Sequence, residues 1–112
     1  MSSLPHEVLE RIEARDGEWS SHATDARRDL GLGWNDVVSV AQTAATWKRE
    51  TDEMGVAVDG WKDSVTGRDT YGRELYMTGK WVYFEGENCW YVITIHQLCK
   101  EKAQRPKRRE SR

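Results

Sequence analysis

Four side chains in the second half of the chain are of types that transfer protons and bind phosphate: Lys48, Lys62, Tyr76 and His96. Cleavage of RNA through its own 2′-hydroxyl needs a group that accepts a proton, a group that donates one and a cation that stabilises the charged phosphate. Lysine, tyrosine and histidine supply these functions without a metal ion. The residue types therefore favour metal-independent cleavage of single-stranded RNA, provided that folding brings them together as a catalytic set.

Further basic and aromatic side chains extend this hypothesis. Arg49, Arg73 and Lys80 are candidates for binding the phosphates of the substrate. Tryptophan and tyrosine rings in the same half of the chain could stack on unpaired bases, although core packing explains most of them. The catalytic candidates also have structural interpretations, because a sheet carries lysine on its solvated face and tyrosine or histidine as packing residues. The hypothesis therefore rests on their convergence.

The spacing of the remaining reactive residues argues against a metal centre or a cofactor. The three histidines are scattered, and Cys89 and Cys99 form no Cys-x-x-Cys pair. Gly31-Leu32-Gly33 lacks the preceding strand and the following pattern of a nucleotide-binding fingerprint. We therefore expect no metal and no cofactor.

The elements that must position these residues belong to a short chain. Its 112 residues suffice for one hydrophobic core but not for two. We expect a single α+β domain over residues 1–98 and a flexible basic tail over residues 99–112. The tail carries seven Lys and Arg against two Asp and Glu, whereas the preceding residues carry ten against seventeen. The tail is either a phosphate-seeking arm or a solubilising end.

The sequence also bears on location. Residues 2–14 are charged and lack the apolar segment of a secretory signal. No stretch approaches the roughly 20 apolar residues that a membrane-spanning helix needs. We therefore expect a cytoplasmic protein with no membrane partner.

The first 45 residues predict about three helices. Apolar residues at helical spacing predict the first, which extends to about Arg15. Ser20 or Ser21 can cap a second helix over residues 23–30, and the sequence from Trp34 to about Ala45 predicts a third.

From Thr46 onward the pattern changes to that of strands, because polar and apolar residues alternate and turn residues recur. We expect four strands, at Thr46–Glu53, Gly60–Thr66, Arg73–Glu85 and Asn88–Leu98. The clearest hairpin signal lies between the last two, and Gly79 predicts a bulge within the third.

Alternation also assigns side chains of the last strand to faces. It places Tyr91, Ile93 and Ile95 on one face and Trp90, Val92, Thr94 and His96 on the other. Helices followed by hairpin-linked strands are typical of the α+β class. We expect the helices to pack on one face of an antiparallel sheet of about four strands, and the other face to meet water or a ligand.

Several short motifs follow one another in a distinctive order between residues 20 and 98. They are Ala26-Arg27-Arg28-Asp29-Leu30-Gly31-Leu32-Gly33-Trp34-Asn35-Asp36-Val37-Val38, Trp47-Lys48, Trp61-Lys62-Asp63-Ser64-Val65, Leu75-Tyr76 and a closing Val-Ile strand. In this order the chain resembles the MqsR-like toxins of bacterial toxin–antitoxin pairs. Those toxins are ribosome-independent mRNA interferases with a RelE-like α+β fold.

The resemblance implies a metal-independent endoribonuclease that acts on single-stranded mRNA and is bound by a cognate antitoxin protein. Lys48, Lys62 and Tyr76 fall on positions that look functional in that family, and His96 stands where the family tends to carry a basic residue. Lys62 replaces a glutamine of the family pattern, and the lysine expected shortly after the tyrosine is either replaced by Thr78 or displaced to Lys80.

The acidic character of residues 1–98 favours a different class of function. A non-enzymatic interaction protein, such as an immunity protein, an antitoxin-like protein or a phage-encoded inhibitor, could use an acidic surface to mimic nucleic acid or to bind a basic partner. A single-strand binder that uses exposed tryptophan rings is a third hypothesis.

Overall fold

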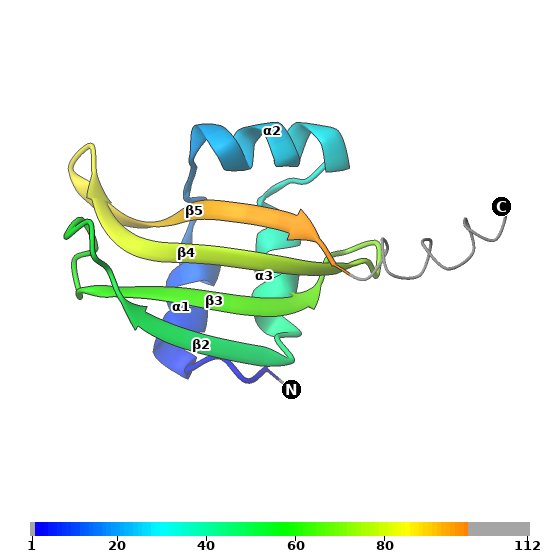
Figure 1. The fold of residues 1–112 in the computed structure, drawn as a ribbon, viewed down its shortest axis with the longest axis horizontal. Helices are drawn as coiled ribbons and strands as arrows, with labels where there is room; N and C mark the ends of the chain where they lie inside the picture. Colours follow the sequence, from blue (N-terminus) through cyan, green and yellow to red (C-terminus); the bar gives the residue numbers. More distant parts are fainter. Residues whose placement is uncertain (1, 99–112) are drawn as a thin grey trace, which may run out of the picture.

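The computed structural model describes residues 2–98, which form three helices and a five-stranded sheet (Figure 1). The helices are α1 (His6–Ala14), α2 (Ser21–Leu30) and α3 (Trp34–Gln42). The strands are β1 (Glu18–Trp19), β2 (Thr46–Thr51), β3 (Trp61–Arg68), β4 (Glu74–Phe84) and β5 (Glu87–Gln97). The expected α+β class with N-terminal helices is confirmed. The expected tail and Cys99 lie outside the described residues.

The sheet differs in one respect from the expected antiparallel sheet of about four strands. Its order is β1-β5-β4-β3-β2, and β1 pairs with β5 in parallel, so the sheet is mixed and has a fifth strand. The sequence indicates only a break between helices at this point. Gly17 explains the extra pairing, because a Cβ at this position would lie 2.0 Å from the carbonyl oxygen of Trp90. Only glycine lets the chain approach β5 so closely.

Local signals fix the ends of the helices. Ser20 caps α2, because its Oγ accepts a hydrogen bond from the amide of Ala23 at 2.9 Å. The N-cap of α3 is Gly33. Asp36 lies inside the helix and accepts a hydrogen bond from the Gly33 amide at 2.9 Å.

The core lies between the helices and one face of the sheet. In Figure 1, α1 and α3 lie behind the sheet and α2 runs along its β5 edge. The largest fully buried side chain is Trp90, which packs with aliphatic side chains from the helices and from the three long strands. We call the opposite face of the sheet, which none of the helices within residues 2–98 covers, the open face. No helix within residues 2–98 has the length and apolar character needed to cross a membrane.

A β-bulge between β4 and β5 alters the predicted alternation. Thr78 pairs with Thr94, whereas Gly79 pairs with Val92, so that Ile93 is an extra residue on β5. The irregularity lies beside Gly79, as predicted, but its extra residue is on β5 rather than within β4. The predicted faces of β5 are therefore wrong beyond this point. Ile95 joins Val92 in the core, and the residue after Ile95, which is His96, emerges on the open face.

Candidate active site

Three rows of side chains cross the open face from β2 to β5. Each row follows the pairing register of the strands. The rows are Thr46-Thr66-Tyr76-His96, Lys48-Ser64-Thr78-Thr94 and Glu50-Lys62-Lys80-Tyr91. All four catalytic candidates therefore share the open face, although they do not all meet at one point.

A pocket of about 360 Å³ lies on the β2 side of this face. It is lined by Thr46, Trp47, Lys48, Glu50, Ser64, Val65 and Tyr76. Lys48 and Glu50 come from β2, Ser64 from β3 and Tyr76 from β4, so the pocket brings together groups from three adjacent strands. Two of the four catalytic candidates, Lys48 and Tyr76, face this pocket directly.

The hydroxyl of Tyr76 is held at the centre of a small polar network. It donates a hydrogen bond to Ser64 Oγ at 3.2 Å and accepts one from Thr78 Oγ1 at 3.0 Å. These hydrogen bonds lower the pKa of Tyr76 below its ordinary value, and the bond with Ser64 has the largest effect. Burial and the nearby Glu50 raise this pKa, whereas Lys48 lowers it further. A phenol with a lowered pKa is a better proton donor than an ordinary tyrosine.

A carboxylate lies between the two lysine candidates. Glu50 Oε2 is 3.6 Å from Lys48 Nζ, and Glu50 Oε1 is 3.8 Å from Lys62 Nζ. The Lys48 side chain is 75% exposed and the Lys62 side chain 33% exposed, so both ammonium groups can reach a ligand on the open face. Exposed ion pairs of this kind are weak. A phosphate can therefore compete with Glu50 for either lysine.

His96 is beside Tyr76 but outside the pocket. The two ring centroids are 5.0 Å apart, with an angle of 35° between the planes. His96 is on β5, three strand spacings from Lys48 on β2, which corresponds to about 14 Å between the backbones. The structure therefore pairs His96 with Tyr76 as an aromatic surface and does not bring it to Lys48.

Arg49 lies on the opposite face of the sheet, among the helix-side residues. Its Nε donates a hydrogen bond to Asp63 at 2.8 Å, and its guanidinium lies 5.5 Å from the ring of Trp47 and 5.4 Å from that of Trp61. The hydrogen bond to Asp63 raises the pKa of Arg49 further above its ordinary value. Successive side chains of a strand point to opposite faces, so Arg49 cannot join Lys48 in one site. The structure therefore places Arg49 on the other face of the sheet from the pocket that Lys48 lines.

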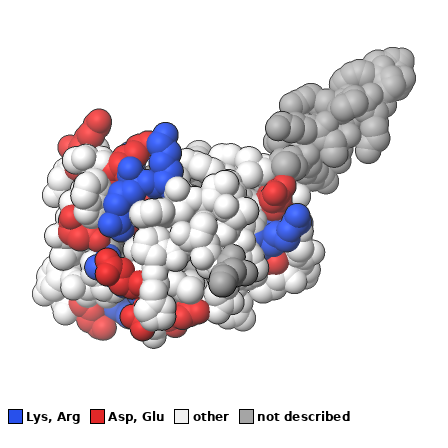
Figure 2. Space-filling model, turned by 90° about the horizontal axis from the view of Figure 1, so that it is seen from below, with Lys and Arg blue, Asp and Glu red and all other residues white. Residues whose placement is uncertain are grey.

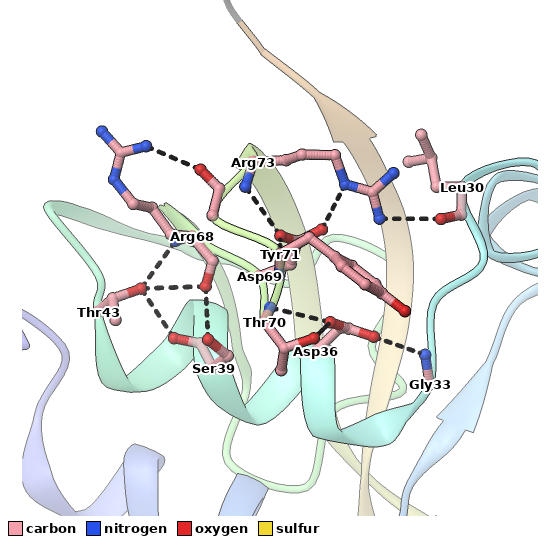
Figure 3. A network of polar contacts seen from close by, with 11 residues as sticks. Leu30, Gly33, Asp36, Ser39, Thr43, Arg68, Asp69, Thr70, Tyr71 and Arg73 are labelled. Atoms are coloured by element: carbon pink, nitrogen blue, oxygen red, sulfur yellow. Dashed lines mark hydrogen bonds and ion pairs between the residues drawn. The ribbon is translucent and has the colours of Figure 1, made fainter.

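Arg73 also lies away from the pocket, at the turn between β3 and β4, where its guanidinium is hydrogen-bonded (Figure 3). Its Nε donates to Asp69 at 2.7 Å and its Nη2 to the carbonyl oxygen of Leu30 at 2.9 Å. The neighbouring Thr70 bonds to Asp36 of α3 through both its amide and its hydroxyl. Arg73 thus ties the turn to the helices, away from the pocket.

Lys80 lies in a row of the open face but is buried in an ion pair. Its Nζ is 3.1 Å from Asp52 Oδ1, and the two side chains are 7% and 1% exposed. Burial raises the pKa of Asp52, but hydrogen bonds from the amides of Ala57 and Val56 and from Lys80 outweigh this effect and lower it to about 2. Lys80 therefore anchors the loop after β2 through Asp52, and its charge is neutralised by this buried ion pair.

The charges on the molecule are mixed rather than uniformly basic. Figure 2, which looks onto the β2 edge, shows Lys and Arg side chains next to Asp and Glu side chains. Within residues 1–98, seventeen acidic residues exceed ten basic ones. Within the described residues, any affinity for phosphate would therefore come from the local pair Lys48 and Lys62 rather than from the overall field.

The structure places three further polar residues around Tyr76: Glu50, Ser64 and Thr78. Glu50 could be assigned to the face of Lys48 from the sequence, since it follows Lys48 by two positions on one strand. The hydroxyls could not, because their proximity depends on the register between β3 and β4.

No protein-family model matches the sequence, and no curated protein matches it significantly.

Proposed function

We propose that the open face binds single-stranded RNA and cleaves it through the 2′-hydroxyl without a metal ion, as a toxin-like mRNA interferase. The observation that carries the proposal is the pocket that both Lys48 and Tyr76 line, in which the pKa of the Tyr76 hydroxyl is lowered. A proton donor and a cation in one pocket are two of the three functions that the reaction needs. The proposal includes a cytoplasmic location, where mRNA is translated, and a cognate antitoxin that controls the enzyme.

The residues of the open face have separate roles in this proposal. Lys48 and Lys62 bind the scissile phosphate and stabilise the charge that develops on it. Tyr76 donates its proton to the departing 5′-oxygen. The rings of Tyr76 and His96 offer a surface on which a neighbouring base stacks, since rings bind unpaired bases with little sequence preference. Arg49, Arg73 and Lys80 have no role in binding the substrate.

The proposal is tested with end-labelled single-stranded RNA incubated with the purified protein in EDTA. The wild type should cut the RNA and leave a 2′,3′-cyclic phosphate and a 5′-hydroxyl, and a 2′-deoxynucleotide at the cut site should block the reaction. Tyr76→Phe should lower the cleavage rate by about 10²-fold or more, because general acid catalysis contributes at least this much. Tyr83→Phe is the matched control, since Tyr83 is 69% exposed and does not line the pocket of Tyr76.

A second pair of variants tests the cation. Lys48→Ala should reduce both cleavage and RNA affinity, whereas Arg28→Ala, which removes a positive charge from the exposed surface of α2, should change neither by more than about twofold. Induced expression of the wild type should arrest bacterial growth, and Tyr76→Phe should not. RNA left intact by the wild type, or cut equally well by Tyr76→Phe, would show that the proposed function is wrong.

A second candidate function has its own structural support. A mainly apolar groove of about 610 Å³ lies at the other end of the open face. Its walls include Met54, Val56, Tyr83 and Phe84, and the Met54 and Tyr83 side chains are 78% and 69% exposed. Exposed apolar grooves commonly bind other proteins. A non-enzymatic interaction protein would neither cut RNA nor arrest growth, so the tests above separate the two functions.

A further inference from the structure

The proposed reaction lacks one function, which is a group that accepts the proton of the attacking 2′-hydroxyl. A charged lysine has no lone pair with which to accept a proton, and the phenol of Tyr76 is assigned as the donor. Among the residues that line the pocket, Glu50 alone carries a carboxylate, and it lies between the two lysines that would hold the phosphate. A carboxylate is a common general base in enzymes.

We propose that Glu50 is the general base of this reaction, an assignment that rests on the proposed function. The residue belongs to the same pocket but has no part in binding the phosphate. Its carboxylate lies between the ammonium groups of Lys48 and Lys62, at 3.6 Å and 3.8 Å, and the residue lines the pocket. Half of its side chain, 49%, is exposed, so a ribose can reach it.

The geometry suits an in-line displacement at phosphorus, in which the attacking and departing oxygens lie on opposite sides. Glu50 comes from β2 and Tyr76 from β4, and Ser64 of β3 lies between them in the pocket. Two strand spacings separate the backbones of β2 and β4 by about 10 Å, and Glu50 also lies four residues, about 13 Å, along β2 from Thr46, which is in the row of Tyr76. The long side chain of Tyr76 shortens this separation, because its hydroxyl reaches Ser64 and Thr78 in the next row toward Glu50. A phosphodiester would lie between this hydroxyl and the carboxylate.

In the proposed reaction, Glu50 takes the proton from the 2′-hydroxyl, and the 2′-oxygen forms a bond to phosphorus. The bond from phosphorus to the 5′-oxygen breaks, and that oxygen takes the proton of Tyr76. The products are a 2′,3′-cyclic phosphate and a free 5′-hydroxyl. Proton exchange with water then restores the carboxylate and the phenol.

A carboxylate in this position lowers the affinity for the substrate, because it repels the phosphate that the lysines attract. Glu50→Gln removes this repulsion and keeps the size of the side chain. Affinity for a non-cleavable 2′-deoxy oligonucleotide should therefore rise by a few-fold at low salt, whereas cleavage of the ribose substrate should fall by about 10²-fold or more. A residue with only a structural or phosphate-binding role would move both quantities in the same direction.

The control for this variant is Glu53→Gln, which makes the same change at an exposed residue outside the pocket. Thermal unfolding checks that both variants fold. A second variant, Glu50→Ala, tests the base directly, because added formate should restore cleavage in proportion to its concentration if the missing function is proton acceptance. The same addition should not rescue Tyr76→Phe.

The outcomes separate this inference from the function on which it rests. If the wild type cuts RNA and Glu50→Gln cuts it at the same rate, the assignment of Glu50 is wrong and the proposed function stands. A parallel loss of affinity and cleavage in Glu50→Gln, without formate rescue of Glu50→Ala, also overturns the assignment. If the wild type itself leaves RNA intact, the proposed function and the assignment fall together.

Discussion

Replacement of Asp52 by asparagine tests the buried ion pair that fixes the loop after β2. Asp52 Oδ2 accepts hydrogen bonds from the amides of Val56 and Ala57 at 2.9 Å and 2.8 Å, and Oδ1 lies 3.1 Å from Lys80 Nζ. An asparagine oxygen can still accept from the amides, but it leaves the Lys80 ammonium without a counter-ion. Loss of one partner from a buried pair costs about 3 to 5 kcal/mol. We therefore expect Asp52→Asn to lower the free energy of unfolding by about 3 kcal/mol at pH 7.

The pH dependence follows from the pKa of Asp52, which hydrogen bonds and Lys80 lower from 3.8 to about 2 against the opposing effect of burial. This difference corresponds to roughly 2 kcal/mol of stability. Because the folded-state pKa is the lower one, this stabilisation is fully present above about pH 4 and is lost as the pH falls toward 2. The free energy of unfolding of the wild type should therefore exceed that of Asp52→Asn by about 3 kcal/mol at pH 7 and by only about 1 kcal/mol at pH 2.

Urea unfolding followed by tryptophan fluorescence, at intervals from pH 7 to pH 2, measures both stabilities. Glu53→Gln is the matched control, because it removes a carboxylate from the next, exposed residue and should stay within about 0.5 kcal/mol of the wild type throughout. A gap between wild type and Asp52→Asn that keeps the same size from pH 7 to pH 2 would refute the reasoning. So would a control that follows the same pH profile as Asp52→Asn.

Three further substitutions test other parts of the structure, each by urea unfolding. Gly79→Ala should destabilise the fold by about 2 kcal/mol, because the added Cβ would lie 2.6 Å from the ring of Trp90. Unchanged stability would contradict this, since it would show that β4 moves freely enough to relieve the clash. Arg49→Met should cost about 3 kcal/mol by leaving the buried Asp63 without its guanidinium, and the variant that remains folded should cut RNA at the wild-type rate. Ser20→Ala removes the cap of α2 and should cost about 1 kcal/mol; an unchanged midpoint would show that the cap contributes nothing.

Much of the fold could be read from the sequence because the signals are local. Alternation of polar and apolar residues located the four long strands to within a few residues of their observed ends. The hairpin between β4 and β5 turns at Glu85 and Gly86, whose φ angles of +50° and +88° are those of a tight two-residue turn. The cap at Ser20 and the bulge at Gly79 are likewise visible in single residues.

The composition of the site was predictable only in part. Period-two alternation places Lys48 and Glu50 on one face and Arg49 on the other, so the sequence by itself already excludes a shared site for Lys48 and Arg49. The grouping of Tyr76 with Ser64 depends on the register between β3 and β4, which the order of residues along one strand does not specify.

The sequence alone determined the order of helices and strands and the residues that could do chemistry, because propensity, capping and alternation act between near neighbours. The tertiary structure decided which of those residues meet. Insertion of Ile93 as an extra residue brings His96 onto the open face, and folding of the loop after β2 brings Asp52 to Lys80, 28 positions away. Both outcomes depend on contacts between distant segments, so no local pattern specifies them.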